Sequence, residues 1–224
     1  MSSINVSKEN NKENESAKPN PIIENIKSRY ILLKIYDNIP KIKKLAIAKY
    51  NKKIQNLLNL STKDYKEYCK IEIEIIPKKG KYGKFININE NDALYYHIYF
   101  NDNKEEIKNK YEIDEEDKIT KIRIIIDYKI KSFKNLFKFI ECIEYINFKN
   151  FNRNNITDMS EMFFGCSSVK ELNLNNFNTY NVTDMRCMFS RCSSLEELNI
   201  NNFNTNNVTN ASNMFYGCSA LKKN

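Results

Sequence analysis

The C-terminal part of the chain is built from a 26-residue repeat, and this repeat constrains the fold more than any other feature. The segments FNRNNITDMSEMFFGCSSVKELNLNN (151–176) and FNTYNVTDMRCMFSRCSSLEELNINN (177–202) are identical at 16 of 26 positions without a gap. A third copy begins at Phe203, and a degenerate copy upstream has apolar residues at the same phases, namely Phe133, Leu136, Phe137, Ile146 and Phe148. Repeats of this length indicate small structural units that stack, so that each buries the apolar edge of the next.

The first half of each unit has the apolar spacing of a short helix. In residues 151–176, Met159, Met162 and Phe163 fall at i, i+3 and i+4, which places them on one helical face. We therefore expect a short helix in each unit, with a threonine N-cap (Thr157, Thr183) and a left-handed glycine after its last turn (Gly165, Gly217).

The second half of each unit alternates with period two. Leu172 and Leu174 flank Asn173, which predicts a short strand with its leucines inward and its asparagine outward. Stacked units would then form a parallel sheet. Cysteines recur once per unit at Cys166, Cys192 and Cys218, which predicts a ladder of buried thiols and no metal site, because zinc needs four converging ligands.

The unit, with N-V-T-D-M, M-F and C-S-S-L-x-E-L-N-I in register, resembles the BspA-like leucine-rich repeats over roughly residues 131–224. That family is found in bacterial surface proteins and is expanded in protists. The resemblance implies an α/β leucine-rich-repeat solenoid with short parallel strands and short helices, used for adhesion or partner binding, without an active site. This sequence departs from the family in two ways. It shows no export signal or membrane anchor, and its units are slightly longer than the commonest length.

Three segments precede the repeats. Residues 1–21 are polar and charge-balanced, which predicts a disordered tail. Residues 22–70 read as helical, with a break at Pro40, and residues 71–121 read as a mixed strand and helix region that caps the solenoid. The solenoid itself is expected over 122–224.

Apolar periodicity locates individual elements in these segments. One helical stripe is expected from Ile31, Leu32, Ile35 and Ile39, and a second apolar set from Ile42, Leu45, Ile54, Leu57 and Leu58. Strands are expected over 71–75, 85–88, 94–100 and 121–127, with a charged helix or loop over 104–118.

Residues 28–58 also resemble an F-box. The resemblance rests on Ile31 and Leu32, on the Ile35–Tyr36 step, and on a following proline and leucine-rich helix. The leading proline of an F-box is absent, and the F-box tryptophan is at best replaced by Tyr50. The resemblance implies a substrate adaptor of a cullin-type ubiquitin ligase that binds the ligase's linker protein. The alternative is a plain helical cap for the solenoid.

The positive charge is concentrated outside the repeats. Residues 22–70 carry twelve Lys and Arg against four acids, whereas residues 131–224 carry ten against eight. A nucleic-acid-binding protein normally has a stripe of basic residues on its binding face. The nearly neutral repeats have none, so we expect no nucleic-acid partner for them. The lysines of 22–70 are either a solvated face or a docking surface for an acidic partner.

The sequence offers little for catalysis. His97 is the one histidine and stands among tyrosines in an expected strand, and no glycine-rich phosphate loop is present. We expect no enzyme activity, no cofactor and no metal. No apolar run approaches the roughly 20 residues of a membrane span, so we expect a cytoplasmic protein with reduced cysteines and no membrane partner.

The outward strand positions are the candidate partner-binding residues. They are Asn147, Lys149, Glu171, Asn173, Asn175, Glu197, Asn199 and Asn201. Such a ladder of amides and charges suits a peptide or a folded protein, although every exposed sheet face also needs polar residues for solubility. The leading hypothesis is a protein–protein interaction module with a protein partner. The alternatives are the ubiquitin-ligase adaptor and a cell-surface adhesion protein.

The stretch from Ser219 to Asn224 matches the residues just before Leu198. The last unit is therefore expected to stop before its strand and to expose apolar groups and an open sheet edge. Either the sequence is a fragment whose next unit follows, or that end frays, or another chain covers it.

Overall fold

The computed structural model describes residues 29–222, which fall into two compact units that divide between Tyr65 and Lys66. The tail expected over 1–21 lies outside the described residues. Within 29–222, no helix has both the length and the apolar character needed to cross a bilayer.

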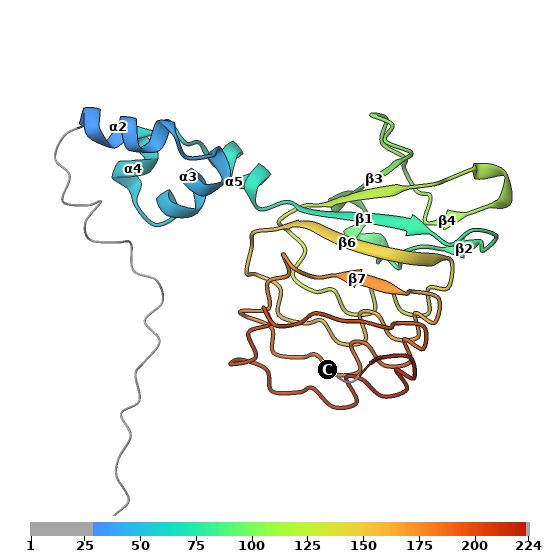
Figure 1. Ribbon diagram of the computed structural model, residues 1–224. Coiled ribbons are helices and arrows are strands. Elements are labelled where there is room, and N and C mark those ends of the chain that lie inside the picture. The colour runs from blue at the N-terminus through green and yellow to red at the C-terminus, as the bar shows by residue number, and fades with distance from the viewer. Residues whose placement is uncertain (1–28, 223–224) are drawn as a thin grey trace, which may run out of the picture. The chain divides into compact units, whose positions relative to one another are not determined.

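The first unit is helical. It contains α2 (Arg29–Asp37), α3 (Lys41–Ala48) and α4 (Lys52–Leu57), and α5 (Thr62–Tyr68) begins in it (Figure 1). Its small core consists of Leu32, Tyr36, Ala48 and Ile54. The Asn51 side chain accepts a hydrogen bond from the Ile54 N–H and so caps α4.

The buried stripe of α2 is rotated from the expected one. Leu32 and Tyr36 are buried, and Ile39 packs beside them, which gives the spacing i, i+4 and i+7. Ile31 and Ile35, expected in the stripe, are 50% and 40% exposed. The apolar residues of this helix outnumber the positions that face the small core, so periodicity alone selected the wrong pair.

The second unit contains a five-stranded mixed sheet in the order β3-β5-β1-β6-β7. Its strands are β1 (Ile71–Pro77), β3 (Tyr96–Phe100), β5 (Ile122–Ile126), β6 (Ile143–Phe151) and β7 (Glu171–Asn173). Only β6 and β7 pair in parallel; the other neighbours are antiparallel. The alternation of Ile71, Ile73 and Ile75 places these side chains inward, as expected, and the sheet joins the repeats to residues upstream of them.

Two of the expected strands differ. Phe85 and Ile86 are buried but lie outside any strand, next to the short pair β2 (Gly83–Lys84) and β4 (Glu112–Ile113). Residues Glu90–Tyr95 form a 3-10 helix that precedes β3, and a second 3-10 helix covers Glu115–Asp117. A short apolar run does not separate a strand from a buried irregular segment, because both need only inward apolar side chains.

The repeats form four coils that lie one below another along the chain (Figure 1). We number them coil 1 (131–150), coil 2 (151–176), coil 3 (177–202) and coil 4 (203–222). Parallel bridges join Ser132 to Asp158, Asp158 to Asp184 and Asp184 to Asn210, so each coil is displaced by one repeat from the last. The strand expected in each unit forms as β7 in coil 2, but in coil 3 it is reduced to the single bridge from Glu171 to Glu197.

The helices expected in the repeats are not present. Residues 132–140, 158–166, 184–192 and 210–218 form consecutive turns, which we call the turn segments. Each has two residues with positive φ, such as Glu161 (56°) and Gly165 (72°), and these interrupt a helical path. The expected left-handed conformation at Gly165 and Gly217 is confirmed, and Arg191 adopts it too.

The turn segments direct their N–H groups toward the next coil instead of along a helix. In coil 2, the N–H groups of Met159, Glu161, Phe163 and Gly165 donate to carbonyls of coil 3 at 2.8–2.9 Å. The same four positions donate from coil 1 to coil 2 and from coil 3 to coil 4. These bonds between coils satisfy the amides that a helix would have satisfied internally.

The expected threonine caps are also wrong. The Thr183 hydroxyl donates to the carbonyl of Thr157 in the preceding coil, at 3.1 Å. The carboxylate of Asp158 takes the capping position and accepts the N–H of Ser160 at 2.8 Å. Asp184 and Asn210 do the same in their coils. A short Asp or Asn side chain reaches the N–H two residues on, which makes a local turn.

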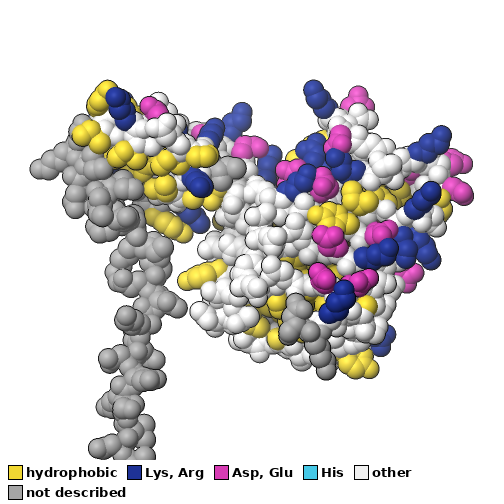
Figure 2. Space-filling view, viewed as in Figure 1, with side chains coloured by type: hydrophobic (Ala, Val, Ile, Leu, Met, Phe, Trp, Pro, Cys, Tyr) yellow, Lys and Arg dark blue, Asp and Glu magenta, His cyan; other side chains and the backbone are white. Residues whose placement is uncertain are grey.

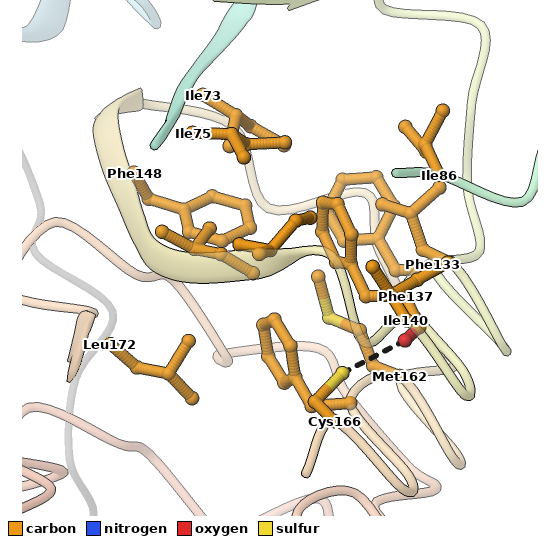
Figure 3. Close-up of a cluster of buried hydrophobic side chains, with 14 of the residues drawn as sticks. Ile73, Ile75, Ile86, Phe133, Phe137, Ile140, Phe148, Met162, Cys166 and Leu172 are labelled. Atoms are coloured by element: carbon orange, nitrogen blue, oxygen red, sulfur yellow. Dashed lines mark hydrogen bonds between the residues drawn. The ribbon is translucent and has the colours of Figure 1, made fainter. Parts of the chain in front are cut away.

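The core of this unit is continuous from the sheet into the coils (Figure 3). Phe137, Phe163, Phe189 and Phe215 stack in series with ring centroids 5.5, 5.6 and 5.7 Å apart and planes within 7° of parallel. The helical spacing that predicted Met159, Met162 and Phe163 on one face therefore identified inward residues correctly, although no helix forms.

The predicted ladder of buried thiols is confirmed for Cys166 and Cys192, whereas Cys218 is only half-buried. The Cys166 thiol donates to the Phe137 carbonyl of the preceding coil (Figure 3). The thiols of Cys192 and Cys218 donate in the same way to the carbonyls of Phe163 and Phe189, each in the preceding coil. Burial raises the pKa of all three thiols, and that of Cys192 to about 12. The thiols therefore act as neutral donors that tie each coil to the one before it.

Asparagine amides make a second set of ties between coils. The Asn202 Nδ2 donates to the carbonyls of Leu174, Asn175 and Phe177 at 3.0–3.2 Å, and Asn176 makes similar bonds one coil earlier. The Nδ2 atoms of Asn181 and Asn207 likewise reach carbonyls of Asn154 and Tyr180. Part of the asparagine content of the repeats is therefore structural.

Candidate binding surface

The strand edges of successive coils place the candidate residues in rows. Asn173 lies in register with Asn147, and Glu171 lies between Tyr145 on one side and Glu197 on the other. Leu172 and Leu174 point into the core between them. The alternation that predicted this face from sequence therefore gives the observed inward and outward sides.

The candidate residues differ in accessibility. Asn147 and Asn173 are half-buried, whereas the others are exposed: Lys149, Glu171, Asn175, Glu197, Asn199 and Asn201. In Figure 2 the coils present mostly uncharged polar groups and backbone on the viewed face, with charged side chains in small groups. The surface therefore offers mainly hydrogen-bonding groups to a partner.

Several candidate amides already have partners within the protein. The Asn173 Oδ1 accepts the N–H of Asn175 at 3.2 Å, and the Asn199 Oδ1 accepts the N–H of Asn201 at 3.1 Å. These bonds turn the chain out of each strand. The carboxylates of Glu171 and Glu197 and the Nδ2 of Asn173 are consequently better placed for a partner than the amide oxygens.

The same outward face continues across the rest of the sheet. Asn147 lies opposite Glu74 of β1, Glu74 opposite Arg123 of β5, and Arg123 opposite Tyr99 of β3. The Arg123 guanidinium sits 4.2 Å from the centre of the Tyr99 ring, a cation–π contact. The sequence did not indicate that these residues extend the row, because strand pairing is not encoded in the alternation of one strand.

Ion pairs fix several charges on this face. Lys149 pairs with Glu74, so its ammonium is not free for a partner. Lys222 approaches both Glu196 and Glu197 at 3.4 Å, and hydrogen bonds to these carboxylates raise its pKa. The Lys222 pairs are exposed and each is worth little to stability, so a partner could replace them at small cost.

The residues considered for chemistry do not converge. His97 lies outward on β3, with Nδ1 at 3.1 Å from Glu106 Oε1 and Nε2 at 3.4 Å from Asp127 Oδ2. Within residues 29–222, no group of three or more His, Cys, Asp and Glu side chains has the arrangement needed to hold a metal ion.

Comparison with known proteins matches part of the chain to one family. Residues 131–224 match the family described as "Mycoplasma protein of unknown function, DUF285", which is related to the BspA-like and leucine-rich repeats. The match begins at coil 1, so it includes the degenerate copy. No support for an F-box is found. No curated protein and no solved structure matches the chain.

Proposed function

We propose that residues 131–222 form a leucine-rich-repeat solenoid of the BspA-like type and that the protein is a protein-binding module. The proposal is supported by the equal displacement of the coils and by the repeated bonds between them, which use the same positions at each junction. The family match over 131–224 adds to this support.

The observation that carries the binding function is the row of outward carboxylates and amides on adjacent coils. Glu171 and Glu197 are exposed and in register, and Asn173 lies beside them. The backbone holds these groups at regular spacing. Binding then needs to order only the few side chains of the row, so its entropic cost is small and recognition is favoured. A partner that presents lysine or arginine side chains at matching intervals fits this face.

The test is affinity purification of the full chain from its native cells, followed by mass spectrometry. A double variant, Glu171→Lys with Glu197→Lys, reverses two charges of the face. The matched control reverses two exposed acids outside the repeats, Glu112→Lys with Glu116→Lys. The proposal predicts a partner that is retained by the wild type and the control and lost by the face variant, while all three have the same circular dichroism spectrum.

The alternatives give different results in the same experiment. Recovery of the linker protein of a cullin ligase, unaffected by the face variant, would favour the adaptor function. A partner set that is identical for all three proteins would contradict the proposed face.

A further inference from the structure

One position of the turn segments holds glycine in two coils and a large side chain in the other two. Phe139, Gly165, Arg191 and Gly217 lie one repeat apart, and their φ angles are 57°, 72°, 59° and 73°. Glycine adopts this left-handed conformation freely, whereas a residue with a Cβ is strained in it. Backbone energy alone would therefore favour glycine at Phe139 and Arg191. Strained residues of this kind often belong to functional sites.

Each of the two large side chains lies over the glycine of the next coil. The Cδ1 atom of Phe139 is 2.5 Å from the place that a Cβ of Gly165 would occupy, and the Cγ atom of Arg191 is 3.4 Å from the equivalent place at Gly217. A side chain at Gly165 would displace the Phe139 ring. The glycines thus leave room for both side chains on the outside of the coils, where Phe139 is 59% exposed and Arg191 is exposed as well.

The half-buried ring of Phe164 lies between these two side chains in the order of the coils. The Phe139 ring meets it edge to face, with centroids 5.1 Å apart, and the Arg191 guanidinium carbon lies 5.6 Å from its centre. The Lys138 ammonium is 5.5 Å from the centre of the Phe139 ring and 5.4 Å from that of Phe164. We call Lys138, Phe139, Phe164 and Arg191 the aromatic–cationic cluster.

The two cations of the cluster differ in their partners. The Lys138 ammonium lies 2.6 Å from the Glu161 carboxylate, which Arg186 also approaches at 3.6 Å. Among residues 29–222, no carboxylate forms an ion pair with Arg191. Its guanidinium is therefore an exposed charge beside an aromatic surface. A guanidinium in such a place binds a carboxylate well, because it donates two parallel hydrogen bonds to the two oxygens.

The surrounding charges favour a peptide over a nucleic acid as the ligand. The turn segments of coils 1 to 3 carry four basic residues, Lys134, Lys138, Arg186 and Arg191, and three acidic ones, Asp158, Glu161 and Asp184. Because these charges nearly balance, a chain of phosphates would gain little attraction here. A single carboxylate needs only Arg191. In an extended peptide, side chains two positions apart lie on one side at a spacing of about 7 Å, which suits a carboxylate on Arg191 and a ring on Phe139.

We propose that the aromatic–cationic cluster is a second docking site, for an extended segment of a partner protein that carries an acidic residue two positions from an aromatic one. The carboxylate accepts hydrogen bonds from the Arg191 guanidinium, and the aromatic ring packs on Phe139. The cluster belongs to the turn segments, whereas Glu171 and Glu197 belong to the strand side of the coils. The inference therefore goes beyond the proposed face and is tested separately from it.

The test is selection of a random heptapeptide library, displayed on phage, against the full chain. We expect the enriched peptides to share an Asp or Glu two positions from a Phe, Tyr or Trp. In fluorescence polarisation, Arg191→Gly and Phe139→Gly should each weaken the binding of an enriched peptide by about tenfold or more. Both variants introduce the residue that this position has in coils 2 and 4, so the circular dichroism spectrum should not change.

Two controls keep the test specific. Lys104→Gly removes an exposed positive charge from a loop outside the coils and should bind the peptide as the wild type does. The double variant Glu171→Lys with Glu197→Lys should also retain the peptide, which separates this site from the proposed face. Arg191→Glu should prefer a peptide with Lys in place of its acid, a change of preference that a purely structural role of Arg191 would not produce.

Three results would overturn the proposal. The first is an absence of enriched peptides, or enriched peptides that lack the pairing of an acid with an aromatic residue. The second is peptide binding that Arg191→Gly leaves unchanged. The third is a single-stranded oligonucleotide that binds the full chain more tightly than every selected peptide and is lost from Arg191→Gly.

Discussion

The phenyl rings of Phe163 and Phe189 stack with their centroids 5.6 Å apart and their planes 4° from parallel, although one full repeat separates them in sequence. The N–H of Phe163 donates to Met188 O, next to Phe189. Backbone and side chain therefore place the two residues in the same phase of adjacent coils. The same relationship recurs at each junction between coils. It therefore determines which side chains stabilise the core and which point outward to a partner.

The position of a phenylalanine in the stack should decide its contribution to stability. Phe163→Ala removes a fully buried ring with neighbours on both sides, and we expect a loss of about 3–5 kcal/mol in the free energy of unfolding. Phe215→Ala removes a partly exposed ring with one stacked neighbour, and we expect about 1 kcal/mol. Urea unfolding followed by circular dichroism measures both. Equal losses would show that the stack is not ordered as described.

The asparagine ties should be sensitive to loss of their donor. The Asn181 Nδ2 donates to the Asn154 carbonyl at 2.8 Å, and Asn181→Asp replaces this donor with an acceptor. We expect a loss of about 1–3 kcal/mol in the free energy of unfolding. Asn178→Asp is the control, because its Oδ1 accepts the Tyr180 N–H and the carboxylate keeps that bond. A change of only about 0.5 kcal/mol or less is expected there. A larger loss of stability for Asn178→Asp than for Asn181→Asp would contradict the asparagine bonds between coils.

The cysteines should differ in reactivity. Cys166 and Cys192 are buried, and burial raises their pKa values, that of Cys192 to about 12, whereas Cys187 is half-exposed. Because the thiolate is the reactive form, Cys192 should stay protonated and unmodified even at pH 10. Brief iodoacetamide treatment and peptide mass spectrometry should show Cys187 labelled well before Cys166 and Cys192. Labelling of all three at one rate would contradict the buried ladder.

The same thiols imply a pH dependence of stability. A pKa that folding raises means that the folded state holds its proton more tightly than the unfolded state. The contribution of Cys192 is therefore complete below the unfolded value near 9 and declines as the pH rises toward about 12. Cys192→Ala should consequently lose less stability than the wild type when urea unfolding is compared at pH 8 and pH 10. An identical loss would argue against a raised pKa.

A buried arginine should destabilise the second unit. Arg153 is 1% exposed, its Nη1 donates to the Asp127 carbonyl, and its Nε and Nη2 have no partner among residues 29–222. Burial lowers its pKa to about 10, so at pH 7 the side chain is still charged and the cost of burying that charge is present. Arg153→Met should therefore raise the free energy of unfolding by about 1–3 kcal/mol.

The control for this change is Arg186→Met, which removes a half-exposed side chain whose guanidinium lies 3.6 Å from Glu161. A shift of about 1 kcal/mol or less is expected. Both are read from thermal and urea unfolding at pH 7. A clear destabilisation by Arg153→Met would mean that the guanidinium is satisfied by groups such as ordered water.

The repeat period and the inward residues could be predicted from sequence because both are local. Met159, Met162 and Phe163 point inward in any compact turn. The prediction that they share an inward face was therefore right, although the prediction of a helix was wrong. The path of the turns could not be predicted, because positive φ at Glu161 and Cys187 is favoured by bonds to the next coil and not by the residues themselves. The same holds for Thr183, whose hydroxyl finds its acceptor in another coil.

The candidate surface was predicted in part. Alternation around Leu172 identified the outward side of each coil, but Lys149 is engaged by Glu74, and this contact depends on the pairing of β6 with β1. The hydrogen bonds from the Asn87 side chain to the carbonyls of Asn135 and Lys138 could not be predicted either, since these residues lie about 50 positions away in the sequence. Contacts between distant segments carry no periodic signal in a single sequence.

Amide hydrogen exchange of the full chain tests the stacking of the coils most directly. The N–H groups of Phe163 and Phe189 donate to the next coil, whereas that of Phe215 has no acceptor within the described residues. Phe163 and Phe189 should exchange slowly and Phe215 rapidly, a difference that an isolated set of turns would not produce. Rapid exchange at all three positions would contradict the stacked coils and, with them, the proposed binding face of Glu171 and Glu197.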